Sequence, residues 1–268
     1  AIFYVVLYVI LLLKSTELSD LNSGSIAFHI YSFAVFAYII SRFGISYYYQ
    51  SHQRHVGATS CYHPSVTFCV PTLNEGAVIR QTIEHIAASD YPKDRFNIVV
   101  INDGSTDDTW KHMIEAKQDA KEKFGVEVEL VNWKKNRGKR EGMAEAVRRS
   151  KNEIVVFIDS DTLVEPDTVK HLVKHFDDPK IGAVAAHGYV ANAEKNMLTK
   201  MQDVRYFVAF KAYKSAEAFF GTVTCCSGCG SAYRREYVMK FLDEWVNQTF
   251  LGVKGTYGDD RSMTNFIL

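Results

Sequence analysis

Acidic residues stand where they could hold a cation beside a substrate. Asp159 and Asp161 directly follow the apolar run 154–158. Because alternate residues of an extended chain point to the same side, both carboxylates can face one ligand. Hard oxygen ligands suit Mg²⁺ or Mn²⁺, which usually bind through one or two carboxylates together with substrate phosphates. A single Asp-x-Asp is a weak signal, since Asp161 could merely cap the next helix, but the buried strand before it favours a metal site.

A second acidic pair lies in the sequence Gly258–Asp259–Asp260–Arg261, which opens a helical stretch. Carboxylates at a helix start can cap the helix and complement its dipole. Alternatively, one of them is a general base for a substrate hydroxyl. The spacing leaves both interpretations open.

A basic loop and a polar loop could bind the rest of the substrate. Residues 134–140 (KKNRGKR) lead into a helix start, which can hold a diphosphate by charge and by free backbone N–H groups; the alternative is a solvated charge run. Asp103 could belong to a helix cap or accept from a nucleobase or ribose. The strand loops contain neither G-x-G-x-x-G nor a P-loop motif, which disfavours those sites. A nucleoside diphosphate held by a metal, a basic loop and acidic loops fits the pattern better.

These loops need elements to position them, and the apolar pattern supplies them. Short β-branched runs predict strands, and amphipathic stretches between them predict helices. Such alternation is typical of an α/β fold with a mainly parallel, Rossmann-like sheet and helices on both faces. Ligands bind beyond the carboxyl ends of such strands, where the polar loops gather. We expect strands at 66–70, 97–101, 126–133 and 154–158, and helices at 78–89, 109–124 and 138–150.

Two further stretches lie after residue 190. The range 193–220 is helical in pattern and rich in aromatic residues, which suits a core helix or a helix at a membrane surface. The range 225–235 (CCSGCGSAYRR) is a loop of small residues, where a ligand can approach the backbone. Cys226-x-x-Cys229 lacks a second ligand pair, so a zinc site is disfavoured.

The first 49 residues are almost free of charge and predict a membrane hairpin. Apolar runs occupy 1–13 and 25–40, and the first is shorter than a full span, which a missing amino-terminal part would explain. Arg42 and the basic residues after it place the following chain in the cytosol. A signal peptide or a buried hairpin of a soluble domain are the alternatives. We expect a transmembrane hairpin at 1–49 with a truncated first helix, a cytosolic linker at 50–64 and a cytosolic catalytic domain at 65–268.

Composition limits the remaining possibilities. The 268 residues include 31 Lys+Arg and 31 Asp+Glu, so the formal net charge is zero, which argues against a nucleic-acid partner. With 47% hydrophobic and 23% charged residues the chain is globular rather than disordered. The five cysteines are too few and too clustered for a disulfide framework, which favours a reducing compartment for the main domain.

The motifs, in their order along the chain, resemble those of processive, membrane-bound family-two glycosyltransferases. These are inverting enzymes with a GT-A fold and include cellulose, chitin and hyaluronan synthases. The stretch 241–268 is most similar to hyaluronan synthases. The motifs that carry the resemblance are VPTLNE, INDGSTDD, NRGKREG, FIDSD, CSGCGSAYRRE and GDDR.

The resemblance implies a role for each matching residue. It implies a uridine site, a diphosphate contact, a metal site with Asp161 as the expected direct ligand, an acceptor loop and a general base. Arg261 would orient the base or touch phosphate. The implied residues are Pro71, Thr72, Glu75 and Asp103 for uridine, Lys139 for diphosphate, Asp159 and Asp161 for the metal and UDP-sugar, Ser227, Gly228, Cys229, Asp259 and Arg261 for the acceptor side, and Asp260 as the base.

The resemblance also implies partners and a location. The donors would be UDP-GlcNAc and UDP-GlcA, the cofactor Mn²⁺ or Mg²⁺, and the acceptor a polysaccharide, with no obligate protein partner. The protein would be integral to the membrane, expected to be the plasma membrane, with its catalytic domain in the cytosol. The family's Q-x-x-R-W motif and carboxyl-terminal membrane helices are expected beyond Leu268, as part of a longer protein.

Other functions remain open on the sequence. The nearest is a chitin or chito-oligosaccharide synthase that uses UDP-GlcNAc alone. A non-catalytic membrane protein that binds nucleotide sugars is disfavoured, because carboxylates are present in all three acidic motifs. A soluble nucleotidyltransferase would require the leading apolar runs to be core.

Overall fold

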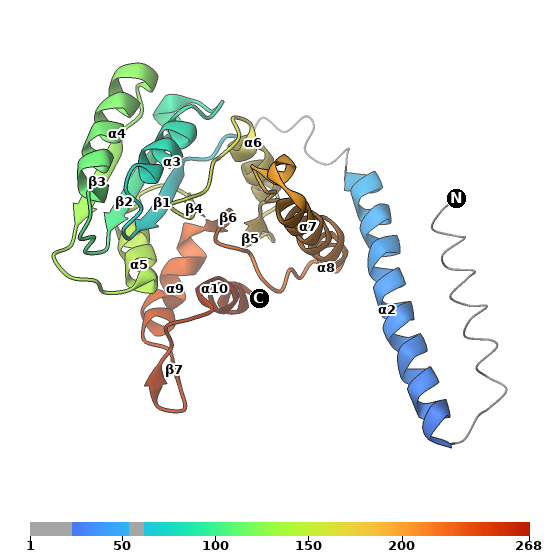
Figure 1. Ribbon diagram of the computed structural model, residues 1–268. Coiled ribbons are helices and arrows are strands. Elements are labelled where there is room, and N and C mark those ends of the chain that lie inside the picture. Colours follow the sequence, from blue (N-terminus) through green and yellow to red (C-terminus); the bar gives the residue numbers. More distant parts are fainter. Residues whose placement is uncertain (1–22, 54–61) are drawn as a thin grey trace.

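The computed structural model describes residues 23–53 and 62–268 (Figure 1). The first apolar run, and with it the first half of the expected hairpin, lies outside the described residues. The described part contains a long amino-terminal helix and an α/β domain.

The domain is built on a six-stranded sheet with the order β3-β2-β1-β4-β6-β5. Strands β1 to β4 run parallel, β6 pairs antiparallel with β4, and β5 pairs antiparallel with β6. The chain builds outward from β1 to β3 and then returns to the other side of β1 with β4. In open α/β sheets such a reversal of strand order marks the ligand crevice. The strands are β1 Val66–Thr72, β2 Phe96–Asn102, β3 Val128–Asn132, β4 Ile154–Phe157, β5 Ala183–Ala185 and β6 Ser231–Arg234, with a separate hairpin of β7 Thr249–Phe250 and β8 Val253–Lys254.

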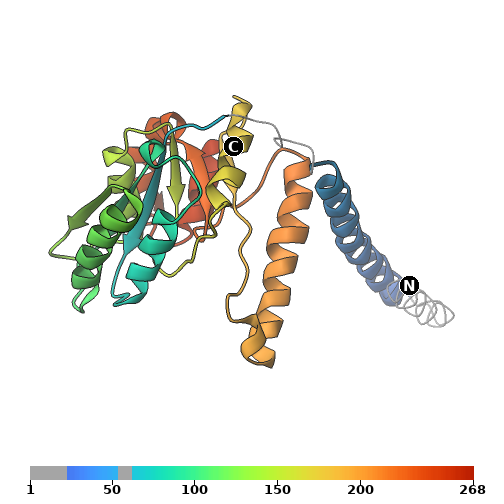
Figure 2. The same cartoon turned by 90° about the horizontal axis from the view of Figure 1, so that it is seen from above.

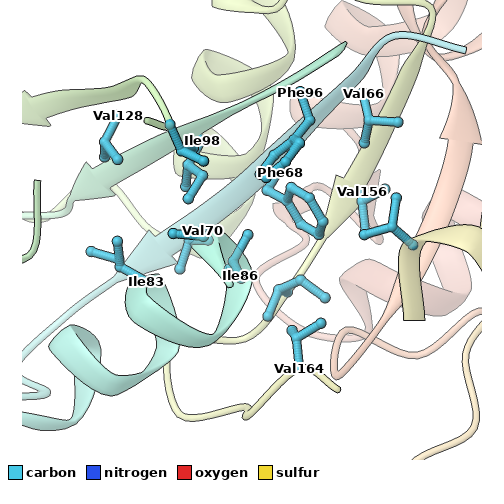
Figure 3. Packing of buried hydrophobic residues seen from close by; sticks show 14 of the residues in the cluster. Val66, Phe68, Val70, Ile83, Ile86, Phe96, Ile98, Val128, Val156 and Val164 are labelled. Atoms are coloured by element: carbon cyan, nitrogen blue, oxygen red, sulfur yellow. The ribbon is translucent and has the colours of Figure 1, made fainter. Parts of the chain in front are cut away.

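Helices cover both faces of the sheet (Figure 1). Val66, Phe68 and Val70 of β1 belong to a core cluster with residues of helices α3 and α4, and Figure 3 shows part of this cluster. Cys69, between them in sequence, belongs to a second cluster with α5 and α9. Because helices cover both faces of the sheet, the sequences of its central strands are nearly continuous apolar runs. The helices of the domain are α3 Val78–Ala87, η2 Lys93–Arg95, α4 Thr109–Phe124, α5 Lys139–Arg149, α6 Thr168–Val173, η3 Lys174–Asp177, η4 Ala193–Lys195, α7 Met197–Tyr206, η5 Phe207–Lys214, α8 Ser215–Phe219, α9 Arg235–Val246 and α10 Asp259–Ile267.

The expected strands and helices of the first half are confirmed, with small shifts at their ends. The α4 helix has the expected bounds, because Gly125 ends it in the left-handed conformation at φ 68° and its N–H donates to the carbonyls of Ala120 and Lys121. Strand β3 is three residues shorter than the run 126–133 suggested. The stretch expected to be helical at 193–220 consists of η4, α7, the π-helical η5 and α8.

The amino-terminal helix α2, Ser23–Gln53, is longer than the apolar run that predicted it. It continues through Arg42 and enters the stretch expected to be a linker. Its segment Phe28–His52 is long and apolar enough to cross a membrane, judged by length and composition. Helix α2 contacts η5 and α8. The stretch formed by η5 and α8 therefore lies between α2 and the sheet domain (Figure 2).

Candidate active site

The polar loops meet at one edge of the sheet because of strand direction. Strands β1, β2 and β4 all end there, and the antiparallel β6 begins there, since Ser231 pairs with Phe157. The loop before β6 therefore faces the loop after β4. The backbone N–H of Asp159 donates to the carbonyl of Gly228 at 3.0 Å and continues the pairing beyond the strands.

Gly228 lies between the carboxylates of Asp159 and Asp260. Its N–H donates to Asp260 Oδ2 at 2.7 Å. A Cβ on Gly228 would stand 2.9 Å from Asp159 Oδ1 and 3.0 Å from Asp260 Oδ1. A side chain at position 228 would therefore require at least one of these two acids, which come from separate acidic motifs, to move.

Lys139, the first residue of α5, places a positive charge beside them. Its Nζ lies 2.6 Å from Asp159 Oδ1. Burial alone would lower the pKa of Lys139, but the carboxylates of Asp159, Asp260 and Asp259 outweigh burial and raise it above its ordinary value. Lys139 is therefore an ammonium at neutral pH, next to the position expected for a diphosphate.

Asp260 has the electrostatic character of a base. Burial raises the pKa of its carboxyl above the ordinary value, and the negative charges of Asp159 and Asp259 act in the same direction. The hydrogen bond from Gly228 and the charge of Lys139 oppose this rise. A raised pKa makes the carboxylate a stronger proton acceptor.

Asp161 is exposed and lines a cavity of about 990 Å³ together with Asp159, His187, Tyr206 and Cys229. Across residues 23–53 and 62–268, no three His, Cys, Asp or Glu side chains are grouped so that they could hold a metal ion by themselves. A cation at this edge would therefore need Asp159 and Asp161 together with oxygens of the substrate. The Lys139 ammonium on Asp159 shows that this position accepts positive charge.

Asp103 organises the basic loop. It is 3% exposed, and its two oxygens accept from the backbone N–H groups of Arg137 at 2.6 Å and Gly138 at 2.9 Å. Gly104 lies against this loop so closely that a Cβ would stand 2.6 Å from the backbone of Lys135 and Asn136. The carboxylate expected to contact uridine thus shapes the loop that leads to Lys139.

The neighbouring acid Asp259 faces another partner. Its Oδ1 accepts from Arg140 Nε at 2.8 Å, and the two side chains are 11% and 6% exposed. Arg140 also donates to the carbonyl of Trp245 at 3.0 Å. The pair ties α10 to α5 and α9, so neither side chain is directed at the Gly228 position.

The other expected site residues are spread around this centre. Pro71 and Thr72 are buried in β1, and Pro71 packs against the Gly142 position of α5. Glu75 accepts from Ser160 Oγ at 2.9 Å, in the loop that holds Asp159 and Asp161. Arg261 is exposed and lines a separate cavity of about 240 Å³. The structure thus brings together Lys139, Asp159, Gly228 and Asp260, with Asp161 and Cys229 on the adjoining cavity.

Two residues that the sequence analysis missed hold this centre. Thr264 Oγ1 accepts from the N–H of Cys226 at 2.9 Å and donates to the carbonyl of Asp260 at 2.7 Å. A helical threonine commonly donates to the carbonyl four residues earlier, so no sequence signal marked its contact with Cys226. Lys214 Nζ lies 2.6 Å from Ser227 Oγ, and no motif marked it.

Comparison with known proteins agrees with this architecture. Residues 67–242, more than half of the chain, match the family described as glycosyl transferase family 2. The chain therefore belongs to glycosyl transferase family 2, and its fold is the GT-A fold, as the motifs suggested.

Two curated relatives differ in their described activity. An N-acetylglucosaminyltransferase of Azorhizobium caulinodans is 35% identical over 206 residues, 76% of this chain and 51% of the relative. A hyaluronan synthase of Streptococcus pyogenes is 31% identical over 246 residues, 91% of this chain and 57% of the relative. The chain thus spans about half the length of these relatives.

Solved structures share the fold. A mannosyltransferase from Pyrobaculum calidifontis in complex with GDP-Man and Mn²⁺ has a TM-score of 0.58 at 26% identity, over 84% of this chain and 59% of that one. S. aureus TarS 1-349 in complex with UDP-GlcNAc has a TM-score of 0.50 at 16% identity, over 76% of this chain and 53% of that one, which supports the fold alone.

Proposed function

We propose that the protein is a membrane-bound, inverting hyaluronan synthase. It would transfer GlcNAc and GlcA alternately from UDP-GlcNAc and UDP-GlcA to a growing polysaccharide and secrete the polymer across the membrane. The observation that carries this proposal is the approach of Asp159 and Asp260 to one point beside Gly228, with Lys139 on Asp159. In an inverting displacement the base and the charged leaving group act on opposite faces of one sugar ring, so the residues that serve them must border the same site.

Each residue of the site has a separate role in the proposed transfer reaction. Asp260 accepts the proton of the acceptor hydroxyl as its oxygen attacks the anomeric carbon from the face opposite UDP. Lys139 stabilises the negative charge that develops on the departing diphosphate. Asp103 holds the backbone of the basic loop so that α5 begins at this position. Ser227, Gly228 and Cys229 form the loop on the acceptor side.

Asp159 and Asp161 would hold a Mn²⁺ or Mg²⁺ ion together with the diphosphate oxygens. Such an ion supplies further electrostatic stabilisation of the leaving group. The Mn²⁺ in the related mannosyltransferase complex supports a divalent cation.

The metal proposal predicts the behaviour of Asp161→Ala. We expect this variant to lose the Mn²⁺-dependent part of UDP binding, measured by titration calorimetry with and without Mn²⁺. Asp177→Ala, an aspartate at the end of η3, is the control for a general loss of negative charge. Equal Mn²⁺ dependence in Asp161→Ala and the unaltered protein would remove Asp161 from the metal site.

The proposed location of the protein rests on α2. Exposed large side chains on this helix, such as Phe28, Tyr31 and Phe33, suit a lipid environment. We therefore place α2 in the bilayer and residues 65–268 in the cytosol, at the plasma membrane.

A synthase that uses UDP-GlcNAc alone is the second candidate. It is supported by the 35% identity to the N-acetylglucosaminyltransferase, which is higher than the 31% to the hyaluronan synthase. The longer match, 91% of the chain, supports hyaluronan.

One experiment separates these functions. The detergent-solubilised full-length protein receives UDP-GlcNAc alone, and then UDP-GlcNAc with UDP-GlcA, and both UDP release and polymer are measured. Polymer formed only with both donors and digested by hyaluronidase supports hyaluronan synthesis. Polymer from UDP-GlcNAc alone supports the second candidate, and absence of UDP release under both conditions contradicts both.

A further inference from the structure

The π-helical segment η5 is attached to the membrane helix by side chains of α2. Ser46 Oγ donates to the backbone carbonyl of Lys211 at 2.9 Å, and Gln50 Nε2 donates to the same carbonyl at 2.7 Å. Gln50 also donates to Ser46 Oγ at 2.8 Å. Ser46 is 3% exposed, so this polar contact is enclosed between the helices. Buried hydrogen bonds of this kind fix the helices relative to each other.

The same segment reaches the active-site loop on its other side. Lys214, three residues after Lys211, places its Nζ 2.6 Å from Ser227 Oγ. The ammonium also lies 4.0 Å from the centre of the Phe210 ring. A charge-assisted hydrogen bond combined with a cation–π contact holds a lysine in one geometry.

Ser227 directly precedes Gly228, so the position of Ser227 determines how the Gly228 N–H meets Asp260. The N–H that donates to Asp260 Oδ2 belongs to the peptide bond that joins Ser227 to Gly228. The carbonyl of Gly228 accepts from the N–H of Asp159. A displacement of Ser227 would therefore rotate the N–H away from Asp260 and alter the orientation of its carboxylate.

We propose that Lys214 is a positioning residue for the transfer reaction, which holds the Ser227–Gly228 peptide against Asp260 and is itself held by α2 through Ser46 and Gln50. This inference rests on the proposed role of Asp260 as the base. It makes the membrane helix part of the catalytic geometry, because the chain of contacts runs from α2 through η5 to Gly228.

Lys214→Met tests the first link, since it keeps the length of the side chain and removes the donor. We expect kcat to fall about tenfold or more, the effect of one charged hydrogen bond, with the KM for UDP-GlcNAc within about twofold. Lys211→Met is the matched control, because it keeps the backbone carbonyl that Ser46 and Gln50 contact. Lys214→Arg restores a charged donor and should recover part of kcat.

Hydrogen–deuterium exchange provides a readout that does not depend on turnover. Lys214→Met should raise exchange in residues 225–230 while exchange in β1 stays unchanged. Ser46→Ala combined with Gln50→Leu should raise exchange in the same loop and lower kcat. Ser51→Ala is the control, because the Ser51 hydroxyl donates to the carbonyl of Tyr48 in the same helix, and it should change neither.

The outcomes distinguish this inference from the proposed function. If the unaltered protein releases no UDP, the proposed function is contradicted. The contact between Lys214 and the loop is then tested by hydrogen–deuterium exchange alone. Unchanged kcat or unchanged loop exchange in Lys214→Met overturns the positioning role. A rise in exchange that includes β1, or a failure of Lys214→Arg to recover kcat, assigns Lys214 a general structural role and also overturns it.

Discussion

At the scale of single residues, the centre depends on which of two adjacent acids faces inward. Successive residues of an α-helix point about 100° apart, so Asp259 and Asp260 at the start of α10 cannot both face Gly228. Asp260 accepts from the Gly228 N–H, and Asp259 forms the buried ion pair with Arg140. The first carboxylate is available for chemistry, and the second holds the helix in place.

Gly228→Ala tests the tight approach of the acids. The added methyl group would stand within about 3 Å of both Asp159 and Asp260, so at least one carboxylate must move. We expect transfer to fall by about 100-fold, the cost of a displacement of about 1 Å in an active site. Gly44→Ala, where a Cβ meets nothing within 4 Å, is the control. Full activity in Gly228→Ala would show that the carboxylates need not keep these positions.

The sequence predicted part of this centre and not the rest. Asp159, Asp161 and Asp260 could be found, because acidic pairs after a strand or at a helix start are visible in the sequence. The contact of the Asp103 carboxylate with the basic loop could not be predicted, since that loop lies more than thirty residues further along the chain. The choice of Asp260 over Asp259 as the base came from the family resemblance, and the ion pair of Asp259 with Arg140 supplies a physical reason for it.

At the scale of elements, the antiparallel β6 decides where the loop 225–230 lies. The alternating apolar runs predicted β1 to β4 and the helices between them, because each pattern is local. They did not predict β6 or its direction, since a strand of four residues carries little periodic signal. Its antiparallel pairing with β4 is what brings residues 227–230 to Asp159.

The buried ion pair between α5 and α10 predicts a loss of stability in Asp259→Ala. This substitution leaves the Arg140 guanidinium, 6% exposed, without its carboxylate. We expect the free energy of unfolding to fall by about 3–5 kcal/mol, measured by urea denaturation in detergent. Asp243→Ala is the matched control, because it removes an exposed pair with Arg148 and should cost at most about 1 kcal/mol. Equal effects of the two substitutions would contradict the structural role of Asp259.

At the scale of the whole molecule, the sheet domain and the apolar helix are joined through η5 and α8 (Figure 2). Arg42 of α2 lies 3.8 Å from Glu217 of α8, and its guanidinium also lies over the ring of Tyr38. The helical stretch of η5 and α8 is therefore held against α2 by side-chain contacts. In the proposed arrangement this fixes the active site at the cytosolic membrane surface.

This arrangement predicts that the protein stays with the membrane under alkaline carbonate extraction. Carbonate removes proteins that are bound by charge and leaves those whose helices are inserted in the bilayer, as α2 would be. We expect the protein in the membrane pellet, detected by immunoblot. Recovery in the supernatant would mean that the apolar helix packs against protein instead.

The central claim is that Asp260 is the base of a site that binds the UDP-sugar through other residues. The most direct measurement compares transfer and UDP binding in Asp260→Asn. We predict that transfer falls by about 10²–10⁴-fold, the usual contribution of a general base, while the affinity for UDP with Mn²⁺ is retained. Turnover comparable to that of the unaltered protein, or a loss of UDP affinity that matches the loss of transfer, would contradict this claim.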